Sequence, residues 1–372
     1  MNKKRTLYAQ ALDPEPTLPP SGIRGRGAVS NASGRFEPHA HVLVDDGWGS
    51  LETPAAQRRT TVTVEAAKSI IARNASPDLS FDRSVNPYRG CEHGCVYCFA
   101  RPTHAFQGLS PGLDFETQLF AKPNAAALLE RELRAPSYTP RVLAMGTNTD
   151  PYQPIERDWA ITRQVVEVLW AYRHPLAIVT KGALVTRDID ILGPMAERGL
   201  AKVALSITTL DRTLARAMEP RAASPERRLE AIAALTEAGI PTSVMVAPVI
   251  PGLNDHEIEA ILKRAAMAGA HGANYVMLRL PLEIKDLFRE WLDTHVPDRA
   301  LRVMSLVRQM RGGKEYDADW MTRQTGTGPI AAMIARRIKL ASRRLGLDRP
   351  PVVLDCSQFR PPPRAGDQLD LL

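Results

Sequence analysis

Three of the four cysteines in this 372-residue chain lie within eight residues, at Cys91, Cys95 and Cys98. Their spacing is C-x3-C-x2-C, on a short loop that contains glycine. Three thiolates at this spacing can hold three irons of a four-iron cluster and leave the fourth iron open to a small molecule. The triplet therefore predicts a metal centre at which a reaction can take place.

Two other interpretations of the triplet stay open at this point. A structural zinc site needs four ligands, and the fourth would be His93, His104 or Cys356. The protein would then be a zinc-stabilised module that binds nucleic acid. Alternatively, the three thiols are buried and only pack, as cysteine side chains often do.

The composition limits the class of protein. Four cysteines in 372 residues do not form a disulfide scaffold, which fits a reducing compartment. We find no apolar stretch long enough to span a membrane and no apolar signal segment at the start. The formal net charge of +7 is compatible with an anionic partner such as nucleic acid. We therefore expect a cytoplasmic protein without a membrane partner.

The chain divides into three predicted segments. Residues 1–75 are basic and rich in proline and are predicted to form a largely disordered leader. Within it, residues 23–28 could touch a phosphate backbone, and residues 41–44 could dock on the core. Residues 76–282 form the predicted core, and residues 283–372 form a mainly helical C-terminal extension with an irregular tail. The helix predicted at 329–345 carries basic residues on one face, which is either solvated or binds phosphate.

Strand and helix patterns alternate through the core. Buried strands are predicted at 141–146, 176–180, 202–207, 242–249 and 274–279, with helices at 158–173, 186–198, 224–239 and 254–269. With one strand before Cys91, this gives six parallel strands joined by right-handed crossovers. An α/β fold follows, either a doubly wound sheet or an incomplete barrel. In both, the loops at the carboxyl ends of the strands build the site.

The cysteine motif also carries a resemblance to a known family. With Tyr97 before the third cysteine, on the loop after the first of six strands, the motif resembles the radical S-adenosylmethionine (radical SAM) superfamily. The longer run from Asn86 to Cys98 looks like the branch related to spore photoproduct lyase and the DNA repair photolyase-like proteins. Residues 149–156 and 180–188 look like that branch too, and the resemblance covers roughly residues 80–282.

The resemblance implies a fold, a chemistry and partners. The expected fold is a partial (βα)6 TIM-type barrel with a helical C-terminal extension. The expected cofactors are one [4Fe-4S] cluster and S-adenosylmethionine, which together give a 5′-deoxyadenosyl radical that abstracts hydrogen from a substrate. An electron donor such as flavodoxin or ferredoxin would reduce the cluster. The expected substrate is a nucleic acid or nucleotide, and the alternative is radical modification of a protein or small metabolite.

The resemblance also implies which residues hold these cofactors. Cys91, Cys95 and Cys98 would be the cluster ligands. Contacts to S-adenosylmethionine would come from Tyr97 and Ile250 at the adenine, Asn148, Thr149 and Asp150 at the methionine amine, Lys181 at the carboxylate, and Ser206 at the ribose or carboxylate. Three of these have simpler alternatives, because Asp150 could cap the turn before Pro151, Lys181 could be a surface cation, and Ser206 could bond to the backbone.

The chain departs from the lyase pattern in one place. Photoproduct lyases carry a hydrogen-donating cysteine at the end of the second strand, where this chain has Ala144 to Asn148 without a cysteine. A lyase-like reaction by that route is therefore not expected, unless Cys356 serves as a remote hydrogen donor rather than packing a C-terminal strand. A second cluster would need further cysteines, so one cluster is expected.

Overall fold

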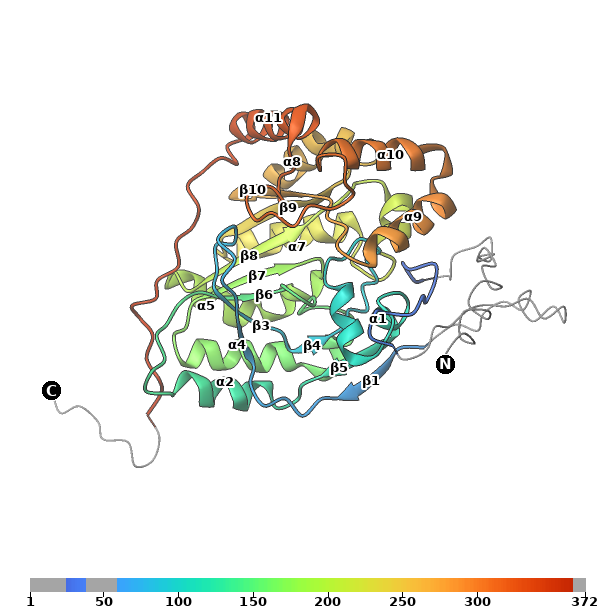
Figure 1. Cartoon of the computed structure of the whole chain (residues 1–372). Coiled ribbons are helices and arrows are strands. Elements are labelled where there is room, and N and C mark those ends of the chain that lie inside the picture. The colour runs from blue at the N-terminus through green and yellow to red at the C-terminus, as the bar shows by residue number, and fades with distance from the viewer. Residues whose placement is uncertain (1–24, 38–58, 364–372) are drawn as a thin grey trace, which may run out of the picture.

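The computed structural model describes residues 25–37 and 59–363. The possible docking of residues 41–44 and the end of the predicted irregular tail lie outside these residues, as does most of the predicted leader. The described chain forms a curved sheet with helices along its outer face (Figure 1). The α/β architecture predicted from the alternating pattern is confirmed.

One seven-stranded sheet organises the described residues, in the order β10-β9-β8-β7-β6-β3-β2. Six of these strands run parallel, namely β3, β6, β7, β8, β9 and β10. Strand β2 pairs with β3 in the antiparallel sense. The five strands predicted after the cysteines are confirmed, with ends that differ by at most two residues. The bounds are β2 Ile71–Arg73, β3 Arg83–Val85, β6 Leu143–Met145, β7 Leu176–Thr180, β8 Ala201–Ser206, β9 Thr242–Val249 and β10 Gly272–Met277.

Helices follow the parallel strands as crossovers. In α4 (Ile161–Ala171), the apolar residues that recur at helical spacing face the sheet and are buried. In α7 (Pro225–Glu237), the Ser224 hydroxyl accepts a hydrogen bond from the Arg227 amide, so the predicted N-cap is confirmed. The remaining bounds in and around the core are η1 Arg101–Gln107, α1 Asp114–Thr117, α2 Ala125–Leu133, α3 Glu156–Trp159, η2 Ala183–Asp188, α5 Ile189–Glu197, α6 Arg212–Met218, η3 Asp255–Glu257 and α8 Ile258–Met267.

The C-terminal extension is helical, as predicted, through α9 (Ile284–His295), α10 (Pro297–Gln309) and α11 (Gly328–Leu345). Helix α11 buries Ile334, Ile338 and Ala341 and packs on α8. On its basic face, Arg337 pairs with Glu259 of α8 at 2.6 Å. Within the described ranges, no helix is long and apolar enough to cross a membrane.

The predicted disorder of residues 1–75 is wrong for the part that the structure describes. Strand β1 (Thr61–Val64) pairs with β5 (Gln118–Ala121), which also pairs with β4 (Tyr88–Arg89) in a small second sheet. Residues 26–29 are buried. The disorder prediction failed because it weighed apolar content, whereas residues 25–37 (the N-terminal strap) are held largely by hydrogen bonds and ion pairs.

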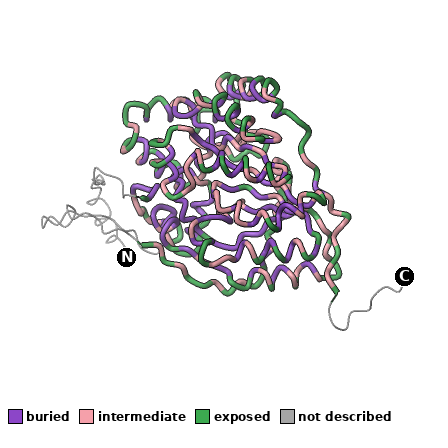
Figure 2. Tube along the Cα trace, turned by 180° about the vertical axis from the view of Figure 1, so that it is seen from behind, coloured by how far each residue is buried: buried purple, intermediate pink, exposed green. Residues whose placement is uncertain are grey.

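The sheet curls into a partial barrel. Strands β3 and β10 are five positions apart in the sheet, which is roughly 24 Å in a flat sheet. Yet Phe99, on the loop after β3, lies 5.2 Å from the guanidinium of Arg279, just after β10. The loop after β3 therefore crosses the mouth of a curved sheet. Buried residues run along the strands, while exposed residues gather on the outer helices (Figure 2).

The N-terminal strap closes over residues 90–98, which we call the cysteine loop. The amides of Gly27 and Ala28 donate to the two carboxylate oxygens of Glu116 at 2.9 and 2.8 Å. A Cβ atom at Gly27 would lie 1.8 Å from the carbonyl oxygen of Gly94 in the cysteine loop. Only glycine fits at this position without displacing one of the two segments. Figure 1 shows the strap in dark blue beside α1.

Gly27→Ala tests this close approach. The added methyl group must push the strap away from the cysteine loop, so we expect the free energy of unfolding to fall by about 1–3 kcal/mol. Urea denaturation measures the loss, and hydrogen exchange should show faster exchange within residues 91–98. Gly193→Ala is the matched control, because a Cβ there has 3.7 Å to its nearest atom. An equal change in both variants would contradict the tight packing.

Candidate active site

The cysteine loop is a series of tight turns at the carboxyl edge of the sheet. The amide of Gly94 donates to the carbonyl of Cys91, and the amide of Cys98 donates to that of Cys95. The Arg101 guanidinium donates to the carbonyls of Gly94 and Cys95 at 3.1 and 2.9 Å. All three cysteines are free; Cys91 and Cys95 are buried, and Cys98 is partly exposed. The loop backbone is thus fixed while the thiols stay unbonded.

The thiols suit a bound cluster. Burial raises the pKa of each thiol, and for Cys91 the charges of Asp150, Cys95 and Cys98 raise it further. Buried thiols that repel one another as thiolates lose their protons only when a metal supplies positive charge. Among the described residues, no three Cys, His, Asp or Glu side chains approach closely enough to share a single metal ion. Three thiols are one ligand short of the four that a structural zinc ion takes, whereas they suffice for three irons of a four-iron cluster.

Both histidines considered as the fourth zinc ligand, His93 and His104, lie in the part of the chain that the structure describes. The Nδ1 atom of His93 pairs with Asp150 at 3.3 Å. The ring of His104 packs against Phe115, with ring centroids 5.6 Å apart. Burial is the main cause that lowers the pKa of His104 to about 4. Neither imidazole, as the structure has it, completes a set of four with the cysteines.

Cys356 lies at the wrong edge of the sheet to act as a hydrogen donor, which corrects that expectation. The neighbouring Asp355 amide donates to the carbonyl of Gly199, two residues before β8 begins. The cysteine loop, in contrast, follows the carboxyl end of β3. Because the two strands are parallel, these positions lie at opposite edges of the sheet. Figure 1 shows the chain after α11 descending on the side away from α1.

Lys181 and Tyr97 are brought together at the mouth of the barrel. The Lys181 Nζ atom lies 5.5 Å from the centroid of the Tyr97 ring, a cation–π contact. Lys181 follows β7, and its positive charge counts among the causes that lower the pKa of Cys95 and Cys98 against their burial. The ammonium therefore faces the cysteine loop, where an anionic group of a bound cofactor would meet it.

The Tyr97 hydroxyl donates a hydrogen bond to a buried carboxylate, that of Glu219. Glu219 accepts hydrogen bonds from Tyr97 and from the Thr208 hydroxyl, and it pairs with the buried guanidinium of Arg228. Burial raises the pKa of Glu219, and Arg228 opposes that rise. The network fixes the Tyr97 ring in one orientation.

Asp150 accepts hydrogen bonds from the scaffold, and its contact with the methionine amine stays a prediction. One carboxylate oxygen accepts from the Tyr152 amide at 2.9 Å and from the Thr180 hydroxyl at 2.6 Å. The other accepts from the Lys181 amide at 2.8 Å and pairs with His93. Burial would raise the pKa of Asp150, but His93 and these hydrogen bonds lower it to about 2. The carboxylate joins the ends of β6 and β7 to the cysteine loop.

The structure places the other four residues expected to contact S-adenosylmethionine in different surroundings. Ser206 donates its hydroxyl to the carbonyl of Ala247 at 2.9 Å, so the simpler alternative is the one observed. The Thr149 hydroxyl donates to the carbonyl of Gly90 and supports the cysteine loop. Asn148 is exposed at the same edge, and Ile250 is buried in an apolar cluster with Cys95 and Tyr97. The contacts of Asn148 and Ile250 with S-adenosylmethionine stay predictions.

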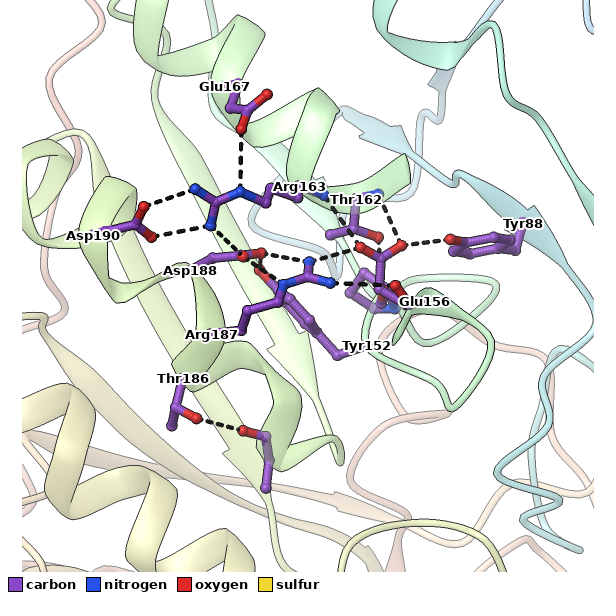
Figure 3. A network of polar contacts seen from close by, with 12 residues as sticks. Tyr88, Tyr152, Glu156, Thr162, Arg163, Glu167, Thr186, Arg187, Asp188 and Asp190 are labelled. Atoms are coloured by element: carbon purple, nitrogen blue, oxygen red, sulfur yellow. Dashed lines mark hydrogen bonds and ion pairs between the residues drawn. The ribbon is translucent and has the colours of Figure 1, made fainter. Parts of the chain in front are cut away.

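The two later motif segments meet in a buried polar network (Figure 3). Glu156 accepts hydrogen bonds from Tyr88 and from the Thr162 amide, and it pairs with Arg187 at 2.7 Å. Asp188 accepts from the Tyr152 hydroxyl at 3.1 Å and pairs with both Arg187 and Arg163. Burial is the leading cause that raises the pKa of the Tyr152 and Tyr88 hydroxyls, with the two carboxylates next. The network ties the loop after β6 to the loop after β7.

Sequence patterns missed several residues that support the site. Glu116 and Arg101 form a fully buried ion pair beneath the cysteine loop. The Gln153 side chain accepts a hydrogen bond from the Glu92 amide at 2.8 Å. Arg26 lies in the segment for which contact with phosphate was one possibility, and it is buried and donates to the carbonyl of Glu116. The signal that could have found the strap is its glycine spacing, R-G-R-G-A, which fits close backbone contact.

A basic hollow of about 580 Å³ opens beside the cysteine loop. It is lined by His93 of that loop and by residues that follow β6, β7 and β8. Arg221 pairs with Glu92 there at 2.8 Å, and Arg227 pairs with the exposed Glu230 at 3.3 Å. The Arg157 guanidinium has no hydrogen bond or ion pair in the described part of the chain, and only its backbone amide donates, to the carbonyl of Pro154. The hollow therefore offers cationic side chains at the functional edge.

Comparison with known proteins gives relatives and a fold. Uncharacterized proteins of Mycobacterium bovis and Mycobacterium tuberculosis are 41% identical over 233 residues, which cover 62% of this chain and 68% of theirs. A protein of Pseudomonas phage M6, described as a radical SAM Nalpha-GlyT isomerase, is 27% identical over 55% of this chain and 40% of its own. Among solved structures, a spore photoproduct lyase mutant matches with a TM-score of 0.52 at 15% identity, over 76% of this chain and 79% of that chain.

The match to a family model is more specific about the site. The model of the Radical SAM superfamily matches residues 85–265, from the last residue of β3 into α8. The matched span thus takes in the cysteine loop, the network of Figure 3 and the crossovers as far as α8. This chain belongs to the radical S-adenosylmethionine superfamily of enzymes.

Proposed function

We propose that this enzyme holds one [4Fe-4S] cluster on Cys91, Cys95 and Cys98 and abstracts hydrogen from a nucleic-acid or nucleotide substrate. The observation that supports the first part is the set of three free thiols on one loop. Of the described residues considered as a fourth ligand, His93, His104 and Cys356 are all engaged or placed elsewhere. The cluster therefore keeps an open iron. Free thiols and such a cluster suit a reducing compartment such as the cytoplasm.

When bound, the reduced cluster and S-adenosylmethionine supply the 5′-deoxyadenosyl radical that abstracts hydrogen. The chain contributes position and charge. Lys181, fixed over Tyr97, binds the cofactor carboxylate by a charge-assisted hydrogen bond. Asn148 and Ile250 line the same mouth. A small electron donor, such as flavodoxin or ferredoxin, would supply the electron.

The chain offers no thiol for returning a hydrogen atom to the product. All four cysteines lie in the described residues, three belong to the cysteine loop, and Cys356 lies at the far edge. The end of β6 contains Ala144 and Met145 and provides no thiol. We therefore propose hydrogen abstraction without a cysteine relay, which separates this enzyme from the lyase reaction expected of that branch.

Charge and relatives support nucleic acid as the substrate class. The chain carries a formal charge of +7, and cations line the hollow beside the cysteine loop. Phosphate backbones bind such surfaces. One solved spore photoproduct lyase of this fold is complexed with dinucleoside spore photoproduct. A protein or small-metabolite substrate is the alternative that the binding experiment below distinguishes.

Cys95→Ala should abolish release of 5′-deoxyadenosine. Wild-type protein, reconstituted without oxygen and given S-adenosylmethionine and dithionite, should form the product, because the cluster keeps all three thiolates. Chromatography of the quenched reaction measures it. Cys356→Ala is the matched control and should keep wild-type product formation. Product from the Cys95 variant, or loss in the Cys356 variant, would contradict the assignment of ligands.

Lys181→Gln should weaken binding of S-adenosylmethionine. A hydrogen bond to a charged group contributes about 1.5–3 kcal/mol, so the Kd should rise roughly 10- to 150-fold. Isothermal titration of reconstituted protein measures this Kd. Lys202→Gln is the control, since that ammonium donates to the Val352 carbonyl near the opposite edge of the sheet. An unchanged Kd for Lys181→Gln would leave Lys181 as a surface cation.

The enzyme should bind single-stranded DNA or RNA with an affinity that falls steeply as salt rises. Fluorescence anisotropy at several salt concentrations gives the slope of log K against log salt. Arg157→Gln and Arg227→Gln, in the hollow, should each reduce that slope by about 1. Arg344→Gln, on the exposed face of α11, should not change it. Binding that salt does not affect would point to the protein or metabolite alternative.

A further inference from the structure

Arg279 stands at the mouth of the barrel without an anionic partner. It follows β10 by two residues, at the same carboxyl edge as the cysteine loop. Its Nε atom is buried and has no hydrogen-bond acceptor within the described residues. The guanidinium makes no ion pair with the described residues either, and it lies over the face of Phe99, 5.2 Å from the ring centroid. A partly buried guanidinium in this state lacks hydrogen-bond acceptors that an incoming ligand can provide.

The charges around Arg279 increase the need for an anion. Arg311 is buried nearby, and its guanidinium donates to the carbonyls of Leu278 and Thr322. Burial, followed by the charge of Arg279, lowers the pKa of Arg311. The charge of Asp317 opposes this lowering, and its carboxylate accepts hydrogen bonds from the Asp319 amide and the Thr322 hydroxyl. In the adjoining segment, Asp78 already binds Arg323 through both oxygens. Two neighbouring cations thus share an edge where these two carboxylates already have donors.

The partner of Arg279 is an exposed aromatic ring next to a cluster ligand. Phe99 directly follows Cys98, and 46% of its surface is exposed. A large apolar side chain left open at a functional edge is a surface for ligand contact. An aromatic ring beside an arginine is also the combination that stacks a nucleobase while holding its phosphate.

We propose that Arg279 binds a phosphodiester of the nucleic-acid substrate and that Phe99 stacks on the adjacent base. The pair thereby positions one nucleotide beside the cysteine loop, within reach of the radical chemistry. This proposal rests on the proposed substrate class and deepens it. The hollow lined by Arg157 and Arg227, at the same edge, would hold the flanking backbone.

The test measures binding of a fluorescent single-stranded oligonucleotide to the reconstituted enzyme with S-adenosylmethionine present, from about 50 to 200 mM salt. R279Q should reduce the slope of log K against log salt by about 1, because one phosphate contact is lost. R279K should restore the slope, since a lysine also neutralises one phosphate. F99A should weaken binding about 5- to 150-fold at fixed salt, with the slope unchanged.

R198Q is the matched control. Arg198 also stacks on an aromatic ring, Trp170, at 5.4 Å, but it lies just before β8 at the opposite edge of the sheet. R198Q should therefore leave both affinity and slope unchanged. Circular dichroism and iron content of every variant identify any that has failed to fold, and R279K tests the charge if R279Q is among them.

The possible outcomes separate this inference from the function on which it rests. If wild-type enzyme shows no salt-dependent binding, the proposed substrate class is wrong. If wild type binds but R279Q keeps its slope, Arg279 makes no phosphate contact and the inference is overturned while the substrate class stands. If R279Q loses affinity for S-adenosylmethionine by titration and keeps the oligonucleotide slope, Arg279 serves the cofactor carboxylate instead, which also overturns the inference.

Discussion

The geometry of the site depends on one buried carboxylate, Glu116. It pairs with the fully buried Arg101, whose guanidinium holds the carbonyls of the cysteine loop. It also accepts the amides of Gly27 and Ala28, so it fixes the N-terminal strap on the other side. Removing one partner of a buried ion pair costs about 3–5 kcal/mol, because the remaining charge is left uncompensated. The ion pair of Glu116 and Arg101 therefore stabilises the turns that present the three thiols.

A second set of carboxylates arranges the sheet edge around that loop. Asp150 links the ends of β6 and β7, Glu156 and Asp188 join the loops that follow them, and Glu219 orients Tyr97. These acids are all occupied by donors of the protein itself. The side chains left open at the mouth include cations and aromatic rings, such as Lys181 and Phe99, beside the exposed Asn148. Such a mouth suits an anionic cofactor group and an anionic substrate.

The repetitive elements and the ligand triplet could be predicted from sequence, because local patterns encode them. Strands β7 and β9 and the cap at Ser224 follow from apolar periodicity and side-chain chemistry. The roles of Asp150 and Cys356 could not, since they depend on which residues from distant segments lie beside them. The strap escaped notice for a related reason: its burial comes from amide contacts with Glu116, which leave no apolar pattern. Arg279 became informative only when curvature of the sheet placed it on Phe99.

The central claim is that three cysteines hold a four-iron cluster whose fourth iron is open. Mössbauer spectroscopy of protein loaded with iron-57, recorded with and without S-adenosylmethionine, tests it directly. The account predicts a [4Fe-4S] spectrum in which one iron changes when S-adenosylmethionine is added and the other three do not. A spectrum unaffected by S-adenosylmethionine, or protein that binds zinc in place of iron, would contradict it.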